Sequence, residues 1–77
     1  MKRPTDPEEL ELAEKIGAKV KALRLKKELS QSELAVLANI KDYKVVGFVE
    51  QAATFPSLRT LHRLSKGLDV PLSYFFK

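Results

Sequence analysis

Signals that start helices recur along this sequence, and they constrain its fold more than any other feature does. The segment DPEE at residues 6–9 combines an aspartate that can cap a helix, a proline suited to the first helical position and a glutamate that can close a capping box. The segment SQSE at 30–33 has the spacing of a second capping box, and Ser57 can cap a later helix. No segment alternates apolar and polar residues as a half-buried strand does. The sequence therefore predicts an all-α fold.

The apolar residues between these signals repeat at helical spacing. The buried stripe of the first helix is expected to comprise Leu12, Ala13, Ile16, Val20 and Leu23. Asn39 can take the left-handed conformation that ends a helix, Asp42 can cap the third helix, and Pro71 can start a short fifth helix. We therefore expect a compact five-helix bundle over residues 6–77, preceded by a flexible arm at residues 1–5. The first four helices are expected to cover residues 7–27, 31–38, 43–51 and 58–68.

The composition narrows the classes of function. The chain has 77 residues and no cysteine, so neither disulfides nor a thiolate metal site can hold it together. Its net charge of +4 weakly favours a polyanionic partner such as nucleic acid. No apolar run approaches the roughly 18 residues of a membrane span, and the start MKRPTDPEEL lacks the apolar core of a signal peptide. We therefore expect a cytoplasmic protein that does not associate with membranes.

Residues that could support catalysis or bind a metal are scarce. His62 is the only histidine, whereas a metal site needs several ligands at set spacings. The sequence has no nucleophile–base pair in a catalytic context and no glycine-rich phosphate loop. We expect a protein that is not an enzyme and that uses no cofactor or metal.

Three stretches, taken in order, match the pattern of a known family. They are IGAKVKALRLKKELSQSELA at 16–35, Glu50, and PSLRTLHRLSKGLDVPLSYFF at 56–76. Together they resemble the phage-repressor, or Xre/Cro-type, helix-turn-helix family, which has an LSQ-x-x-LA segment, a glutamate closing the reading helix, and a PS-x-x-TL segment. The resemblance implies a lambda-repressor-like fold and a sequence-specific transcriptional regulator that binds double-stranded DNA. It also implies a homodimer on a two-fold operator, with repression as the expected output.

The resemblance further implies which residues meet DNA, because the third helix of this family enters the major groove. The residues expected to face base edges are Asp42, Tyr43, Lys44, Val45, Gly47 and Phe48. Those expected at the DNA backbone are Gln31, Lys41, Ser57 and Arg59. For Gln31 the alternatives are a base contact, support of the reading helix, or simple exposure. Arg24 and Glu50 match a family ion pair that links the first and third helices, and we assign them a structural role.

The third helix departs from the family pattern in its spacing, since the distance from Ile40 to Glu50 is one residue longer than usual. Placing the extra residue in the turn around Lys41 points Val46 and Val49 inward. Placing it inside the helix instead points Val45 and Phe48 inward. The sequence leaves both registers open, although the first retains the usual family roles.

The expected DNA surface is also poor in polar readers and in positive charge. Only Tyr43 and Lys44 of the third helix suit hydrogen bonding to bases, with Asp42 able to accept from a cytosine amine. The following loop, residues 51–55, is usually basic in this family but carries no charge here. Each missing phosphate contact lowers affinity and flattens its salt dependence. Binding is therefore expected to need a dimer.

The aromatic end of the chain suggests where a dimer forms. Phe75 is expected to close the core, and a one-turn helix cannot bury both Tyr74 and Phe76. One of these two is then a candidate dimer contact, because aromatic residues are enriched at interfaces; the alternative is simple packing at the edge of the core. A rival interpretation makes the whole chain a protein-interaction module that has lost DNA binding. The chain as an N-terminal domain of a longer regulator is a further alternative.

Overall fold

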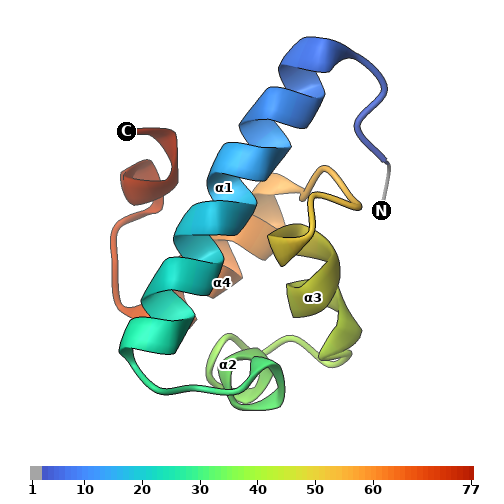
Figure 1. The fold of residues 1–77 in the computed structure, drawn as a ribbon. Helices are drawn as coiled ribbons and strands as arrows, with labels where there is room; N and C mark the ends of the chain where they lie inside the picture. The colour runs from blue at the N-terminus through green and yellow to red at the C-terminus, as the bar shows by residue number, and fades with distance from the viewer. Residues whose placement is uncertain (1–2) are drawn as a thin grey trace.

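The computed structural model describes residues 3–77, which form four α-helices and one short 3₁₀-helix (Figure 1). The elements are α1 (Pro7–Lys26), α2 (Gln31–Leu37), α3 (Lys44–Glu50), α4 (Leu58–Leu68) and the 3₁₀-helix η1 (Leu72–Phe76). Helix α1 crosses the front of the molecule in this view and contacts α3, α4 and η1, while α2 contacts α3 and α4. Within residues 3–77 no strand forms, so the prediction of an all-α fold is confirmed.

The prediction of a fifth α-helix is wrong, because the segment after Pro71 is a 3₁₀-helix. The amide of Tyr74 donates to the carbonyl of Pro71 over 3.0 Å, which closes a tighter turn than that of an α-helix. Such helices are common as runs of a few residues. This turn places Phe75 in the core with none of its side chain exposed, as the sequence predicted for that residue.

The hydrophobic core draws on all five elements. Ile16 and Val20 of the predicted α1 stripe are buried in it, and Leu12 and Leu23 pack against it while partly exposed. Burying one aliphatic side chain contributes about 1.5–3 kcal/mol, so this core, rather than any cross-link, holds the chain together. The core comprises Ile16, Val20, Leu34, Ala35, Ala38, Val46, Val49, Leu61, Leu64, Leu68 and Phe75.

The start of α1 differs in one detail from the predicted capping box. The carboxylate of Asp6 accepts the amide of Glu9 at 2.8 Å, as expected of the cap. The carboxylate of Glu9, however, accepts from the amide and the hydroxyl of Thr5, at 3.0 and 3.1 Å, and so reaches one residue further back. Thr5 is therefore tied to α1. Of the arm predicted at residues 1–5, residues 1 and 2 lie outside the described part of the chain.

The other helix starts follow the predictions. The hydroxyl of Ser30 accepts the amide of Glu33 at 3.0 Å, and the carboxylate of Glu33 accepts the amide of Ser30 at 2.8 Å, so the second capping box is confirmed. These bonds to Ser30 lower the pKa of Glu33, first through the backbone amide and then through the hydroxyl. Ser57 caps α4 by accepting the amide of Thr60 at 3.2 Å.

Left-handed residues close the helices, and none of them is glycine. The residues with positive φ, between 56° and 58°, are Glu28, Asn39, Ala52 and Asp69. Asn39 thus has the conformation predicted for it. The glycines lie inside helices, where two of them let backbones approach. A Cβ on Gly17 would lie 2.3 Å from the carbonyl oxygen of Val49, and one on Gly67 would lie 3.0 Å from the Cβ of Ala38.

Candidate nucleic-acid interface

A buried ion pair fixes the end of α3 against α1. The Nε atom of Arg24 donates to Glu50 Oε2 at 2.6 Å, and its Nη2 atom donates to Glu50 Oε1 at 3.1 Å. The third donor, Nη1, reaches the carbonyl of Leu29 at 2.8 Å. The pKa of Arg24 is raised by the hydrogen bond to Glu50 and by that carboxylate's charge, while burial acts in the opposite direction. The arrangement agrees with the structural role assigned to this pair.

Gln31 extends the same network to α2. Its Nε2 atom donates to Glu50 Oε1 at 3.1 Å, so Glu50 joins α1, α2 and α3. The amide group of Gln31 also covers Gly47, whose Cβ, if present, would lie 3.2 Å from Gln31 Oε1. In this structure Gln31 therefore supports the reading helix, one of the alternatives considered for it.

The burial of Gly47 corrects one predicted site residue. Gly47 is buried, and the direction in which its side chain would point is occupied by Gln31 of α2. It therefore does not belong to the exposed face of α3, where it was expected among the residues facing bases. Its lack of a side chain serves the packing of α2 against α3.

The register of α3 is the one that keeps the extra residue in the preceding turn. Val46 and Val49 have 0 % and 1 % of their surface exposed, whereas Phe48 is 47 % exposed and Val45 is partly buried. The alternative register, with Val45 and Phe48 as the inward pair, is excluded. The outer face of α3 thus carries Val45 and Phe48.

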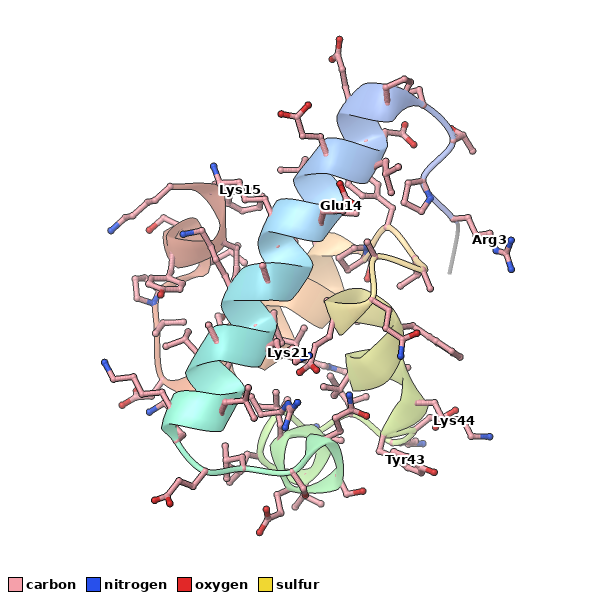
Figure 2. The ribbon with its side chains drawn as sticks, in the orientation of Figure 1. Arg3, Glu14, Lys15, Lys21, Tyr43 and Lys44 are labelled. Atoms are coloured by element: carbon pink, nitrogen blue, oxygen red, sulfur yellow. The ribbon has the colours of Figure 1, made fainter. Side chains whose placement is uncertain are left out.

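The first turn of α3 projects from the molecule. The N-cap residue of α3 is Tyr43, so the prediction of Asp42 as the cap is wrong, although the carboxylate of Asp42 accepts the amide of Lys44 at 3.0 Å from one residue before the cap. The helix begins at Lys44, one residue later than predicted. Tyr43 and Lys44 are exposed, and Figure 2 shows both side chains directed outward at the same corner. Two groups able to bond to base edges therefore lie side by side on the surface.

Two hollows flank the outer face of α3, and Val45 lines both of them. One is bordered by Lys41 and Asp42 of the preceding turn and by Thr60 and Arg63 of α4. Ser57 and Arg59, at the start of α4, are exposed. The other hollow is lined by Arg3, Val45, Phe48, Ala53 and Thr54.

Arg3 lies beside α3 although no sequence pattern predicts that position. It precedes α1 by four positions and is far from α3 along the chain, so no local pattern signals the proximity. The segment before α1 runs beside α3, and this path brings Arg3 to the hollow.

Residues 20–75 match the model of the helix-turn-helix family. The chain belongs to the Xre/Cro-type helix-turn-helix family. It is accordingly a DNA-binding regulator of transcription and not an enzyme.

Solved structures of the same fold include two restriction–modification controller proteins. C.AhdI from Aeromonas hydrophila is 34 % identical with a TM-score of 0.78, over 83 % of this chain and 96 % of that one. Wild-type C.Esp1396I is 29 % identical with a TM-score of 0.75, over 84 % of this chain and 83 % of that one. No curated protein sequence matches this helix-turn-helix chain.

The two aromatic residues expected at a dimer contact differ in their surroundings. Tyr74 is partly buried, with its ring centroid 4.9 Å from the Nζ atom of Lys19 and 6.1 Å from the ring of Phe75 in an edge-to-face arrangement. Phe76 has 48 % of its surface exposed. Of the pair, Phe76 is therefore the better candidate for an intermolecular contact.

Residues 3–77 contain no group of three or more potential metal ligands, and His62 is exposed. No helix within the same residues is long and apolar enough to cross a membrane.

Proposed function

We propose that this protein binds a two-fold operator as a homodimer and represses transcription, acting in the cytoplasm as the controller of a restriction–modification locus. The observation that carries the proposal is the projecting first turn of α3, where Tyr43 and Lys44 lie exposed between cationic flanks. The likeness to two restriction–modification controllers, one of them covered over 96 % of its length, supports the choice of biological setting.

Base recognition would centre on Lys44 and Tyr43. Lys44 can donate to the O6 and N7 atoms of guanine in the major groove, where such contacts are the commonest specific ones. Tyr43 can donate or accept through its hydroxyl. The carboxylate of Asp42 already accepts the Lys44 amide through Oδ1, which leaves Oδ2 for a cytosine amine. Phe48 and Val45 would pack against thymine methyl groups.

Contacts to the DNA backbone would come from both sides of α3. Lys41 lies in the turn before α3, and Ser57 and Arg59 lie at the start of α4, all of them exposed. A phosphate at the start of α4 would meet free backbone amides as well as the Arg59 side chain. Gln31 is committed to Glu50 through one amide hydrogen, and its second would reach a phosphate at the start of α2.

Dimerisation would compensate for the small number of contacts made by each domain. Phe76 is an exposed aromatic side chain on η1, and we propose that it, with the edge of Tyr74, packs against its counterpart in a second copy. Two α3 helices related by a two-fold axis would read half-sites about 34–36 Å apart, one turn of B-DNA.

Selection of binding sites from random duplexes tests this function. The expected result is enrichment of a palindromic motif whose half-sites lie about one helical turn apart. Lys44→Gln should then weaken binding to the selected duplex by about tenfold or more, the effect of losing a good base contact. Lys15→Gln makes the same change in charge on the opposite side of the molecule and should leave binding nearly unchanged (Figure 2).

The selection also tests the rival function. A protein-interaction module would enrich no motif even at low salt, and the Lys44 and Lys15 variants would then behave alike. The exposure of Phe48 beside Lys44 and Tyr43 supports DNA binding, because these two polar side chains can bond to base edges while Phe48 packs against a thymine methyl group.

A further inference from the structure

We propose that Arg3 contacts a DNA phosphate and replaces the positive charge that is missing from the loop between α3 and α4. This inference rests on the proposed function, since it assigns a further contact to the same DNA interface. It concerns a residue outside the helix-turn-helix unit itself, whose matched segment begins at residue 20.

The location of Arg3 is the first observation. Arg3 lines one hollow with Val45 and Phe48 of α3 and with Ala53 and Thr54 of the following loop. Figure 2 shows Arg3 on the same side of the molecule as Lys44 and Tyr43, with its side chain directed outward. A duplex lying along α3 would therefore pass close to Arg3.

Hydrogen bonds fix the segment that carries Arg3. The amide and hydroxyl of Thr5 both donate to Glu9 Oε1, and Asp6 caps α1. Pro4, between Thr5 and Arg3, is partly buried and has a restricted φ. Arg3 is thus two residues from an anchored position, and ordering its backbone on DNA would cost little entropy. The carboxylates of Asp6 and Glu9 are both engaged in these bonds.

The charge of Arg3 is free to meet a phosphate. Within residues 3–77 the structure contains one salt bridge, between Arg24 and Glu50, so no described carboxylate neutralises Arg3. Arg3 is exposed, and among the described residues lining its hollow it alone is charged. A guanidinium group matches phosphate oxygens with paired hydrogen bonds.

Cationic side chains also lie on the other side of α3 from Arg3. Lys41 and Arg63 border the second hollow, and Val45 lies between the two hollows. The major groove has a phosphate backbone along each rim, about 12 Å apart. A helix lying in that groove needs cations on both sides. Lys41 and Arg63 would serve one rim, and Arg3 would serve the other, where residues 51–55 supply no charge.

Salt-dependent binding of the full chain to the selected duplex tests this contact. Arg3→Gln should weaken binding and reduce the slope of log K against log salt by about 0.9 for each subunit, the effect of losing one phosphate contact. Binding to unrelated duplexes should weaken by a similar factor, so the preference for the operator should persist. Arg3→Lys should retain most of the slope, and Lys15→Gln should retain all of it.

The possible failures are distinguishable. If the wild-type chain prefers a duplex but Arg3→Gln has the same slope as Lys15→Gln, the Arg3 contact is overturned while the proposed function stands. A loss of operator preference without a change in slope would make Arg3 a base reader and also overturn the phosphate contact. A wild-type chain that binds no duplex overturns both proposals. Urea unfolding of each variant is the control for folding, and its midpoint should match that of the wild type because the substituted side chains are exposed.

Discussion

Helices α2 and α3 have seven residues each, yet different kinds of interaction fix them in place. Helix α2 begins at a complete capping box, in which Ser30 and Glu33 bond to each other's backbone amides. Helix α3 begins at Lys44, and its N-cap residue, Tyr43, makes no side-chain capping bond; the carboxylate of Asp42, one residue earlier, accepts the amide of Lys44. Its position is instead fixed near its end, by the buried pair of Arg24 with Glu50.

This difference separates the fixed part of α3 from the part that would meet DNA. Isolated helices as short as seven residues are unstable in water, so each must draw stability from elsewhere. Because distant contacts at Glu50 and Gly17 hold α3, its first turn needs no cap and can present Tyr43 and Lys44 outward. Substitutions at these distant contacts should therefore destabilise the protein far more than loss of the α2 capping box does.

Removing the carboxylate of Glu50 should have the largest effect. Glu50→Ala leaves the buried guanidinium of Arg24 without its charge partner and removes the bond from Gln31. Stranding one member of a buried ion pair costs about 3–5 kcal/mol. Urea unfolding followed by circular dichroism measures this loss.

A double variant provides the control for Glu50→Ala. Replacing a buried pair by apolar residues of similar volume is often neutral, so Arg24→Met with Glu50→Leu should recover most of the lost stability. A Glu50→Ala protein as stable as the wild type would show that α3 is not held by this pair.

Adding a methyl group at Gly17 should have the next largest effect. In Gly17→Ala the new Cβ would lie 2.3 Å from the Val49 carbonyl oxygen and 2.9 Å from that of Glu50, so α1 and α3 must move apart. Overpacking of this kind costs about 1–3 kcal/mol. Thermal or urea unfolding measures the loss, and duplex binding should weaken with it.

Gly47→Ala is the matched control, because it adds the same group to the neighbouring helix. Its nearest neighbour would be the end of the flexible Gln31 side chain, at 3.2 Å, which needs to shift by only a few tenths of an ångström. Alanine is favoured over glycine in a helix by about 1 kcal/mol, so this variant should be at least as stable as the wild type. Equal losses at both positions would contradict the account of the α1–α3 contact.

Loss of the capping box should have the smallest effect. Ser30→Ala removes the N-cap of α2 and should cost about 1 kcal/mol in urea unfolding. The pKa of Glu33 is lowered in the folded protein by its bonds to Ser30, so this carboxylate stabilises the fold above its ordinary pKa of about 4.3. That contribution disappears as the pH falls through the lowered value.

The pH dependence distinguishes the box from a general effect of acid. Wild type and Glu33→Gln should differ in unfolding midpoint at neutral pH and converge as the pH falls through the lowered pKa of Glu33, where its carboxylate becomes protonated. A difference that stays constant from neutral to acidic pH would show that the ionised carboxylate is not what supports α2.

The same contrast explains how much the sequence could predict. Local sequence signals are sufficient to predict the start of α2, through the capping box of Ser30 and Glu33, and the left-handed conformation of Asn39. The register of α3 was left with two alternatives, because three of its residues are valines that suit either face. The structure decided between them through contacts with distant residues, which no local pattern encodes.

One predicted site residue, Gly47, is wrongly placed, and one residue beside α3, Arg3, is missed, for the same reason. Gly47 was expected on the outer face, but the amide of Gln31 occupies that direction, and their partnership spans two helices. No local pattern predicts the position of Arg3, because its proximity to α3 depends on the path of the chain before α1. The five-residue helix at the end was predicted as α-helical, since a start signal at Pro71 does not distinguish the two kinds of turn.

The residues with left-handed backbone in this chain are not glycines, and the glycines lie inside helices. Left-handed geometry penalises a non-glycine residue by roughly 1–2 kcal/mol, and Ala52, just past the reading helix, carries this penalty without a polar side chain to offset it. Substitution by glycine at a left-handed helix end such as Ala52 could therefore increase stability, whereas no larger residue fits at Gly17. Natural or laboratory selection can raise the stability of this domain at its helix ends without altering any side chain proposed to contact an operator.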